Sequence, residues 1–183
     1  MNFKSNLRKL IYPYEIILNN IPNNAKIIDI GCGDGHLYND IDKNKIISYT
    51  GIDPKIKKNI KSEKFKIIND NINNITEQVN KYNCIIMIDV MHHLEKDNQE
   101  NIFKKIIYNM SSETVFIYKD ISNRNFFYSN INKLHDLIYN FDFINYYSAE
   151  NIINVLNNNK SLKYKHFFKR IFWYDHEFFI INN

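Results

Sequence analysis

Glycine, proline, cysteine and tryptophan are scarce in this chain of 183 residues, which contains 4, 3, 2 and 1 of them. The two cysteines, Cys32 and Cys84, have no further cysteine or histidine at zinc-ligand spacing, so we expect no bound metal. So few cysteines also fit a reducing compartment. With little proline and no Pro- or Ser-rich linker, nothing marks a domain boundary, and we expect a single domain over residues 1–183.

Long hydrophobic runs and strong local charge are also missing. No apolar stretch reaches the roughly 18 residues that a membrane-spanning helix needs, and the first residues do not resemble a secretory signal. We therefore expect a cytoplasmic protein without a membrane span. The net charge is only +4, and the lysines are scattered rather than gathered in a stripe. This pattern disfavours nucleic acid as a partner.

Five short apolar segments do occur, and they alternate with helical stretches. They lack a clean period of two, which is typical of parallel strands buried on both faces. The segment from Asp97 to Met110 has apolar residues at helical spacing. This alternation predicts a doubly wound α/β sheet. The five expected strands begin at Lys26, Ile47, Phe65, Asn83 and Thr114.

The C-terminal part of the chain follows a different pattern. "AENIINVLNN", from Ala149, predicts a helix, and the aromatic-rich segments "LKYKHFFK" and "FWYDHEFFII" follow with little between them. That spacing favours an antiparallel hairpin at the sheet edge. We therefore predict a mostly parallel, seven-stranded sheet with helices on both faces and an antiparallel C-terminal hairpin strand. An N-terminal helix over residues 1–20 and a helical insertion at about 121–148, over the acceptor site, complete the expected domain.

Three of the four glycines follow the first expected strand in "IIDIGCGDGH". Closely spaced glycines between a strand and a helix permit a tight turn that brings the backbone close to a ligand. A dinucleotide fingerprint would need a glycine at His36. Here the pattern is D-x-G-x-G-x-G, and the carboxylate of Asp29 disfavours a pyrophosphate but attracts a cation. S-adenosylmethionine (SAM) is such a ligand, because it carries an ammonium and a sulfonium group.

On these motifs the sequence resembles the class I SAM-dependent methyltransferases, most clearly from about residue 25 to 120. "DIGCGDG" is similar to the first motif of that family, and "IDVMHHL" is similar to the fourth. The resemblance implies SAM as cofactor, S-adenosylhomocysteine (SAH) as product and a reversed seventh strand. It also implies that Asp53, 18 residues after Gly35, binds the ribose hydroxyls.

The remaining cofactor contacts are likewise implied by the resemblance. Asp70 and Asn71 match the position that contacts the adenine, and Asp89 and His92 would flank the methionine end. The cofactor-binding residues that we predict are Asp29, Gly31, Cys32, Gly33, Gly35, Asp53, Pro54, Asp70, Asn71, Asp89, Val90 and His92.

A second resemblance concerns the acceptor site. The sequence resembles a subset of small bacterial methyltransferases of this class that share three motifs. These are Lys-Asp after the fifth strand, an Asn-x-x-His-Asp helix and Tyr-x-His near the end. On a helical wheel of about 100° per residue, Asn132, His135, Asp136 and Tyr139 share one face. The catalytic or acceptor-binding residues that we predict are His135, His92, Lys119, Asp136 and His176.

SAM already carries an activated methyl group, so alignment supplies much of the rate. An alcohol acceptor needs a base, and histidine suits that task because its ordinary pKa is about 6.5. We expect His135 to be the base or to orient the acceptor, with His92 as an alternative near the cofactor and His93 packed in the sheet. Lys119 and His176 would bind an anionic acceptor. Each histidine also has a structural explanation, because an isolated histidine is more often a packed residue than a catalyst.

The sequence thus predicts a methyltransferase that acts on an oxygen of a small molecule, such as a sugar, a phosphorylated compound or another biosynthetic intermediate. RNA or protein methylation is an alternative, disfavoured because the chain has no separate recognition domain. A non-catalytic SAM-binding regulatory domain is another alternative, which an intact glycine motif does not exclude. A NAD-dependent oxidoreductase fails on the glycine spacing. The sequence leaves open whether O, N or C is methylated and whether the protein is a homodimer.

Overall fold

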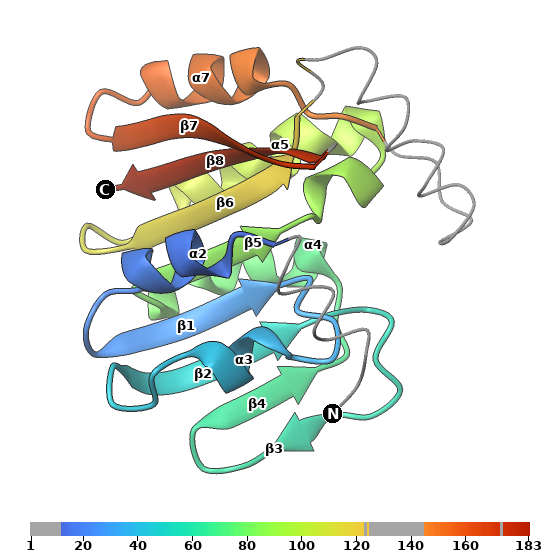
Figure 1. The fold of residues 1–183 in the computed structure, drawn as a ribbon, viewed down its shortest axis with the longest axis vertical. Coiled ribbons are helices and arrows are strands. Elements are labelled where there is room, and N and C mark those ends of the chain that lie inside the picture. The colour runs from blue at the N-terminus through green and yellow to red at the C-terminus, as the bar shows by residue number, and fades with distance from the viewer. Residues whose placement is uncertain (1–11, 123, 125–144, 173) are drawn as a thin grey trace.

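An eight-stranded sheet lies at the centre of the structure, a computed structural model that describes residues 12–122, 124, 145–172 and 174–183 (Figure 1). The strand order is β3-β4-β2-β1-β5-β6-β8-β7. From β4 to β6 neighbouring strands are parallel, whereas β8 runs antiparallel to both β6 and β7. The strands are β1 (Ala25–Ile30), β2 (Ile46–Ile52), β3 (Ile60–Lys61), β4 (Phe65–Ile68), β5 (Cys84–Ile88), β6 (Val115–Ile121), β7 (Lys163–Ile171) and β8 (Tyr174–Asn182).

This arrangement confirms the predicted fold class, including the antiparallel C-terminal hairpin. The eighth strand, β3, adds a ladder of only two residues antiparallel to β4. It forms because the backbone N–H of Ser62 donates to the carbonyl of Phe65 at 2.7 Å, which folds the chain back onto β4. Two residues are too few to give a strand pattern in the sequence.

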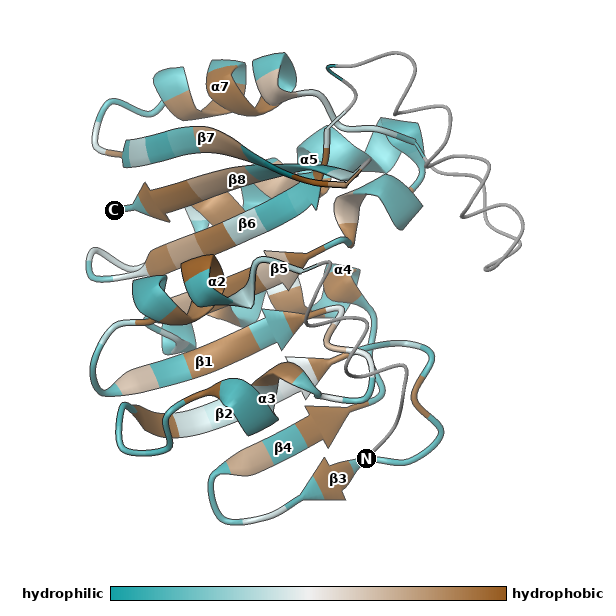
Figure 2. Cartoon of the chain, in the orientation of Figure 1, coloured by the Kyte–Doolittle hydropathy of each residue, from teal (hydrophilic) through white to brown (hydrophobic). Residues whose placement is uncertain are grey.

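Helices cover both faces of the sheet. One face packs against α4, η1, α5 and α7 through residues such as Ile85 and Phe116, and we call it the α5 face. The other packs against α2 and α3 through residues such as Ile86 and Ile117, and we call it the α2 face. Figure 2 shows hydrophobic residues along β1, β4 and β8. The helices are α2 (Tyr14–Asn20), α3 (Leu37–Asp40), α4 (Ile72–Ile75), η1 (Thr76–Lys81), η2 (Met91–His93), α5 (Lys96–Tyr108) and α7 (Ala149–Asn157).

The helices agree with the sequence pattern in part. α7 begins at Ala149 as predicted, because the side chain of Ser148 accepts a hydrogen bond from the N–H of Asn151. After the glycine segment, however, the helix α3 has only four residues. Within the range of the predicted N-terminal helix, 1–20, the structure describes the helix α2, whereas residues 1–11 lie outside the described residues. Most of the predicted insertion also lies outside them and stays a prediction. None of the described helices is long and apolar enough to cross a membrane.

The parallel strands all point their carboxyl ends to the same edge of the sheet (Figure 1). The loops after β1, β2, β4 and β5 therefore gather there. These are the loops that carry most of the predicted cofactor-binding residues. The topology thus brings together residues that are far apart in the sequence, such as Gly31 and His92.

Candidate active site

The loop after β1 is a left-handed bend formed by Gly31, Gly33 and Gly35, whose φ angles are +74°, +51° and +72°. Glycine adopts such angles readily, whereas other residues are strained there. Packing requires two of these glycines. A Cβ atom at Gly31 would lie 2.2 Å from Cγ2 of Val90, and one at Gly35 would lie 2.6 Å from Cδ1 of Ile67. A Cβ atom at Gly33 would meet nothing within 4 Å, so the bend is open there and a ligand can approach its backbone.

Asp53, at the end of β2, holds this bend in place. One carboxylate oxygen accepts the N–H of Gly33 at 2.9 Å, and the other accepts the N–H of Lys55 at 2.8 Å. A carboxylate offers about four lone-pair positions, so Asp53 can still accept hydrogen bonds from ligand hydroxyls. The following Pro54 is exposed, and its carbonyl accepts from the side-chain amide of Asn69 at 3.4 Å.

Asp29 lies beneath the bend, on the α2 face, with 3% of its surface exposed. Its carboxylate accepts a hydrogen bond from the hydroxyl of Tyr49. Burial raises the pKa of Asp29 from 3.8 to about 7, although the Tyr49 hydrogen bond opposes the shift; the charge of Asp53 adds to it. A cation bound near Asp29 would favour its ionised form.

Cys32, within the bend, is half-buried and donates a thiol hydrogen bond to the carbonyl of Gly33 at 3.3 Å. Burial raises the pKa of this thiol well above its ordinary value, and the charges of Asp29 and Asp53 raise it further. Its sulfur also lies where a side chain on Gly51 would be placed, at 2.5 Å from the added Cβ atom. Cys32 therefore packs the bend against β2 and is no nucleophile.

Asp70 and Asn71 follow β4, beside β2, and both support the local backbone. Asp70 accepts from the N–H of Asn71 at 2.7 Å and from the side-chain amide of Asn74 at 2.8 Å. Asn71 is exposed and caps α4 by accepting the N–H of Asn73 at 3.0 Å. The structure thus places these two residues on the same edge as the glycine bend.

Asp89 and Lys119, at the ends of β5 and β6, form a buried ion pair. The ammonium of Lys119 lies 2.6 Å and 2.7 Å from the two carboxylate oxygens of Asp89. It also lies 4.6 Å from the centre of the Tyr12 ring, a cation–π contact. Burial acts to raise the pKa of Asp89, but the charges of Lys119 and His92 and the hydrogen bonds from Lys119 and Tyr12 lower it overall. Asp89 is therefore ionised, and its charge is matched inside the protein.

His92 and Asp120 form a second buried pair next to the first. Nδ1 of His92 is hydrogen-bonded to one oxygen of Asp120. The other oxygen accepts the backbone N–H of His92 at 3.3 Å and the hydroxyl of Tyr118 at 3.4 Å. A carboxylate on Nδ1 favours the tautomer with its proton there, which leaves Nε2 as the basic atom. His93 is exposed and its ring lies tilted against that of His92 with ring centres 4.1 Å apart, so the expectation that it packs in the sheet is wrong.

Asp89, His92 and Asp120 each offer a ligand atom, and these atoms lie within 4.8 Å of one another. Such a group has the spacing of a metal site. The ammonium of Lys119, however, already contacts both oxygens of Asp89, and Asp120 is engaged by His92 and Tyr118. We therefore interpret this group as a hydrogen-bonded network that contains its own cation.

The other predicted acceptor-site residues lie elsewhere or outside the described residues. His176 has 1% of its surface exposed and lies beside Tyr12 and Tyr174, with ring centres 6.0 Å and 5.9 Å away. The strand register puts it on the α2 face together with Lys119. Neither side chain lies at the surface, where a weakly held anion would bind. His135 and Asp136 lie outside the described residues.

The α5 face carries polar residues that we did not predict. Nε2 of His166 lies 2.8 Å from a carboxylate oxygen of Glu177, and Nη2 of Arg170 lies 3.3 Å from one of Asp175. These pairs join β7 to β8. Alternate residues of "KYKHFFKR" and "YDHE" lie on the same face of the sheet, but only the register, which the sequence does not give, shows which of them pair. Asp120 was singled out only through the resemblance, and its pairing with His92 depends on the folded chain.

The strand order, with β8 reversed between β6 and β7, and the open glycine bend after β1 define a Rossmann-like methyltransferase fold. Residues 6–159 match the family model of the methyltransferase domain, so the chain belongs to that family. No protein of curated function matches the sequence.

Solved structures are similar to this chain over nearly their whole length. Magnesium protoporphyrin IX methyltransferase from Synechocystis PCC 6803, crystallised with SAH, is 14% identical, with 100% of this chain and 88% of that chain covered and a TM-score of 0.66. A plantazolicin methyltransferase, crystallised with a triazolic desmethylPZN analog and SAH, is 17% identical, with coverages of 98% and 89% and a TM-score of 0.67. A putative methyltransferase in complex with the Haloferax volcanii Trm112 activator is 8% identical, with coverages of 98% and 93% and a TM-score of 0.73. At such identities the likeness concerns the fold.

Proposed function

We propose that this methyltransferase binds SAM at the glycine bend and transfers the methyl group to an oxygen of a small-molecule acceptor. The observation that carries the proposal is the open backbone at Gly33, which is hydrogen-bonded to the carboxylate of Asp53 and follows the strand that carries Asp29. A cationic nucleoside is the ligand that suits such a place, since the bend admits close contact and the carboxylates attract positive charge. Two of the structural neighbours were crystallised with SAH and are named for small-molecule or peptide-derived substrates, which supports the same reading.

Each part of the ligand has residues suited to it. Asp53 would accept the ribose hydroxyls, and Asp70 and Asn71 would face the adenine from the end of β4. The bend, Val90 and the ionised Asp89 would surround the methionine end, with Lys119 as a positioning residue that fixes Asp89. When bound, SAM supplies the activated methyl group, so the protein has to align the acceptor and take up its proton.

We assign the proton transfer to His92. Its ring is fixed at Nδ1 by Asp120, so the proton of an acceptor hydroxyl would be taken up at Nε2. The negative charge of Asp120 would then stabilise the imidazolium that forms. Asp120 acts through His92 and is therefore a positioning residue. His135 and Asp136, from the resemblance to small bacterial methyltransferases, stay predicted acceptor-orienting residues.

Calorimetry tests the cofactor assignment. We expect SAM and SAH to bind and NAD not to bind. Asp53→Ala should weaken SAM binding at least tenfold, because the variant loses both the ribose acceptor and the hydrogen bond that holds Gly33. Glu113→Ala is the matched control, since Glu113 is an exposed acid before β6, at the opposite edge of the sheet, and should leave binding unchanged. Failure of the unmodified protein to bind SAM at millimolar concentration would refute the proposal.

Two alternatives differ from this proposal in what they would do after SAM binds. An RNA or protein methyltransferase would methylate a macromolecule, whereas a regulatory domain would bind SAM without turnover. SAH formation with a panel of hydroxylated small molecules favours our proposal. Turnover only with RNA or protein favours the first alternative, and tight SAM binding without any turnover favours the second.

A further inference from the structure

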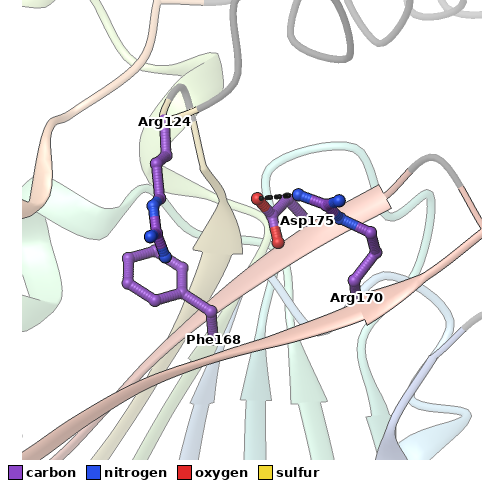
Figure 3. Close-up of a pocket in the computed structure, with 4 residues that line it drawn as sticks. All are labelled: Arg124, Phe168, Arg170 and Asp175. Atoms are coloured by element: carbon purple, nitrogen blue, oxygen red, sulfur yellow. Dashed lines mark hydrogen bonds and ion pairs between the residues drawn. The ribbon is translucent and has the colours of Figure 1, made fainter.

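A cavity of about 410 Å³ lies on the α5 face, beyond the end of β6, and is lined by Arg124, Phe168, Arg170 and Asp175 (Figure 3). Phe168, Arg170 and Asp175 come from the β7–β8 hairpin, whereas Arg124 comes from the segment after β6. The proposed cofactor site uses none of these residues. Two guanidinium groups, one ring and one carboxylate make a site with an excess of positive charge.

The guanidinium of Arg124 lies against an aromatic ring. Its guanidinium carbon lies 4.9 Å from the centre of the Phe168 ring, and its backbone N–H donates to Oγ of Ser122 at 3.1 Å. Within the described part of the chain, its guanidinium has no hydrogen bond or ion pair. Stacking on a ring orients a guanidinium while leaving its five N–H groups available. Arg124 is therefore set up to bind a group with several acceptor oxygens.

The carboxylates near the cavity are already engaged with side chains of the hairpin. Asp175 is buried and lies 3.3 Å from Arg170, which is half exposed. Glu177, the next inward-facing residue of β8, is paired with His166 at 2.8 Å. The positive charge of Arg124 is therefore not offset by these carboxylates, and it would attract an anionic ligand to the cavity.

The cavity lies at a defined distance from the His92–Asp120 pair. In the register, Asp120 is opposite Glu177, and Glu177 is opposite Phe168, so these three side chains share the α5 face. Two strand spacings separate Asp120 from Phe168, which is about 10 Å. A small acceptor of ordinary size can span this distance along the sheet.

We propose that Arg124 and Arg170 form a subsite for an anionic oxygen group, a carboxylate or a phosphate, of the methyl acceptor. The inference rests on the proposed function, and it narrows the acceptor to an acid that reaches from the His92–Asp120 pair to this cavity on the same face of the sheet. Arg124 supplies the unmatched donors, Phe168 supports them, and Arg170 adds charge from the opposite side of the cavity (Figure 3).

Ligand titrations with benzoate, inorganic phosphate and the uncharged benzyl alcohol test this subsite, in the presence and absence of saturating SAH. We expect benzoate or phosphate to bind at least tenfold more tightly than benzyl alcohol. Tighter binding of benzoate indicates that the acceptor carries a carboxylate at this subsite, and tighter binding of phosphate indicates that it carries a phosphate there. Arg124→Gln should weaken the preferred anion about tenfold, as expected for loss of a charge-assisted hydrogen bond.

Two further variants separate this subsite from general surface charge. Arg170→Lys keeps a cation beside Asp175, so the protein should stay folded while anion binding falls severalfold. Lys169→Gln removes one positive charge, as Arg124→Gln does, but from a residue of β7 that lies between Phe168 and Arg170 and faces the α2 side of the sheet. It should therefore leave anion binding unchanged. Equal loss in Lys169→Gln and Arg124→Gln would overturn the proposal, as would absence of anion binding in a protein that binds SAH normally. Failure to bind SAH at all would instead refute the proposed function, whatever the anion titrations show.

Discussion

The ammonium of Lys119 contacts both carboxylate oxygens of Asp89, at 2.6 Å and 2.7 Å, where β5 and β6 end side by side. Lys119 has only 1% of its side chain exposed and Asp89 has 14%. The pair thus places a matched charge directly after β5, between the glycine bend and the His92–Asp120 pair. Asp89 itself has a φ of +54°, an unusual conformation for a residue with a side chain.

Lys119→Met should destabilise the protein by about 3 to 5 kcal/mol, because it leaves the carboxylate of Asp89 buried without its cation. Urea unfolding monitored by circular dichroism measures the change. The double variant Lys119→Met with Asp89→Asn should recover most of the loss, since no buried charge remains. Lys165→Met, at an exposed position of β7, is the control and should change stability by less than about 0.5 kcal/mol. Full stability of the single variant Lys119→Met would contradict this view of the pair.

Asp29 should couple SAM binding to pH. Its pKa of about 7 in the folded protein means that the carboxyl is largely protonated below pH 7, and a cationic ligand favours the ionised form. SAM affinity should therefore rise about tenfold between pH 5.5 and 7. Asp29→Asn should bind SAM more weakly at pH 7 and show little of this pH dependence. Calorimetry across the range measures both, and an equally steep rise in the variant would exclude Asp29 as the cause.

The same substitution should have the opposite effect on the ligand-free protein. The pKa of Asp29 is higher in the folded state than the ordinary value of 3.8, so ionisation in the folded state costs stability. This cost is absent below about pH 4, grows as pH rises and is complete above pH 7. Asp29→Asn should therefore raise the Tm at pH 8 more than at pH 6. A lower Tm at pH 8 would show that the ionised carboxylate is stabilised in a way that the structure does not suggest.

His92→Gln should lower kcat by about 10²- to 10⁴-fold if His92 is the general base. The Kd for SAM should change little, because the side chain is engaged with Asp120. Asp120→Asn should also lower kcat, since it removes the carboxylate that fixes the ring, and should alter the pH profile of kcat. His93→Gln is the matched control at the neighbouring, exposed position. SAH formation with an accepted substrate is the readout, and unchanged turnover in His92→Gln would return the role of base to His135.

Gly33→Ala and Gly35→Ala should separate ligand binding from stability. An alanine side chain at Gly35 meets Ile67 at 2.6 Å, whereas at Gly33 it meets nothing within 4 Å. Both positions have positive φ, which costs about 1 to 2 kcal/mol for alanine. Gly35→Ala should therefore be the more destabilised variant. Gly33→Ala should lose less stability but should weaken SAM binding, because its new methyl group points into the open space of the bend. Thermal unfolding and calorimetry measure the two effects, and equal effects of both substitutions would contradict the open bend.

Much of the fold and of the candidate cofactor site could be predicted from the sequence. Apolar runs such as "KIIDI" predicted the strands, because parallel strands are buried on both faces. The glycines indicated a ligand-binding bend, because glycine is so rare elsewhere in the chain. The loops that follow the strands could then be placed on one edge by topology alone. The contacts of Asp53 with Gly33 follow from that arrangement.

The pairings of charged residues could not be predicted. Asp89 and Lys119 are 30 residues apart, and they meet because Ile88 is opposite Lys119 in the register of β5 and β6. A shift of one residue would turn Lys119 to the other face. Because the sequence does not give this register, it suggested that Lys119 binds an acceptor, whereas in the structure Lys119 is buried beside Asp89. The four-residue length of α3 likewise carries no signal in the sequence.

The reversed direction of β8 has a practical consequence for experiments. Because β8 is antiparallel to β6, Asn182 lies opposite Val115, and the N–H of Asn183 donates to the carbonyl of Thr114 at 3.4 Å. This end of β8 is at the amino edge of the parallel strands, whereas the glycine bend is at the carboxyl edge (Figure 1). An affinity handle attached after Asn183 would therefore immobilise the protein on a sensor chip with the glycine bend turned toward the flowing analyte.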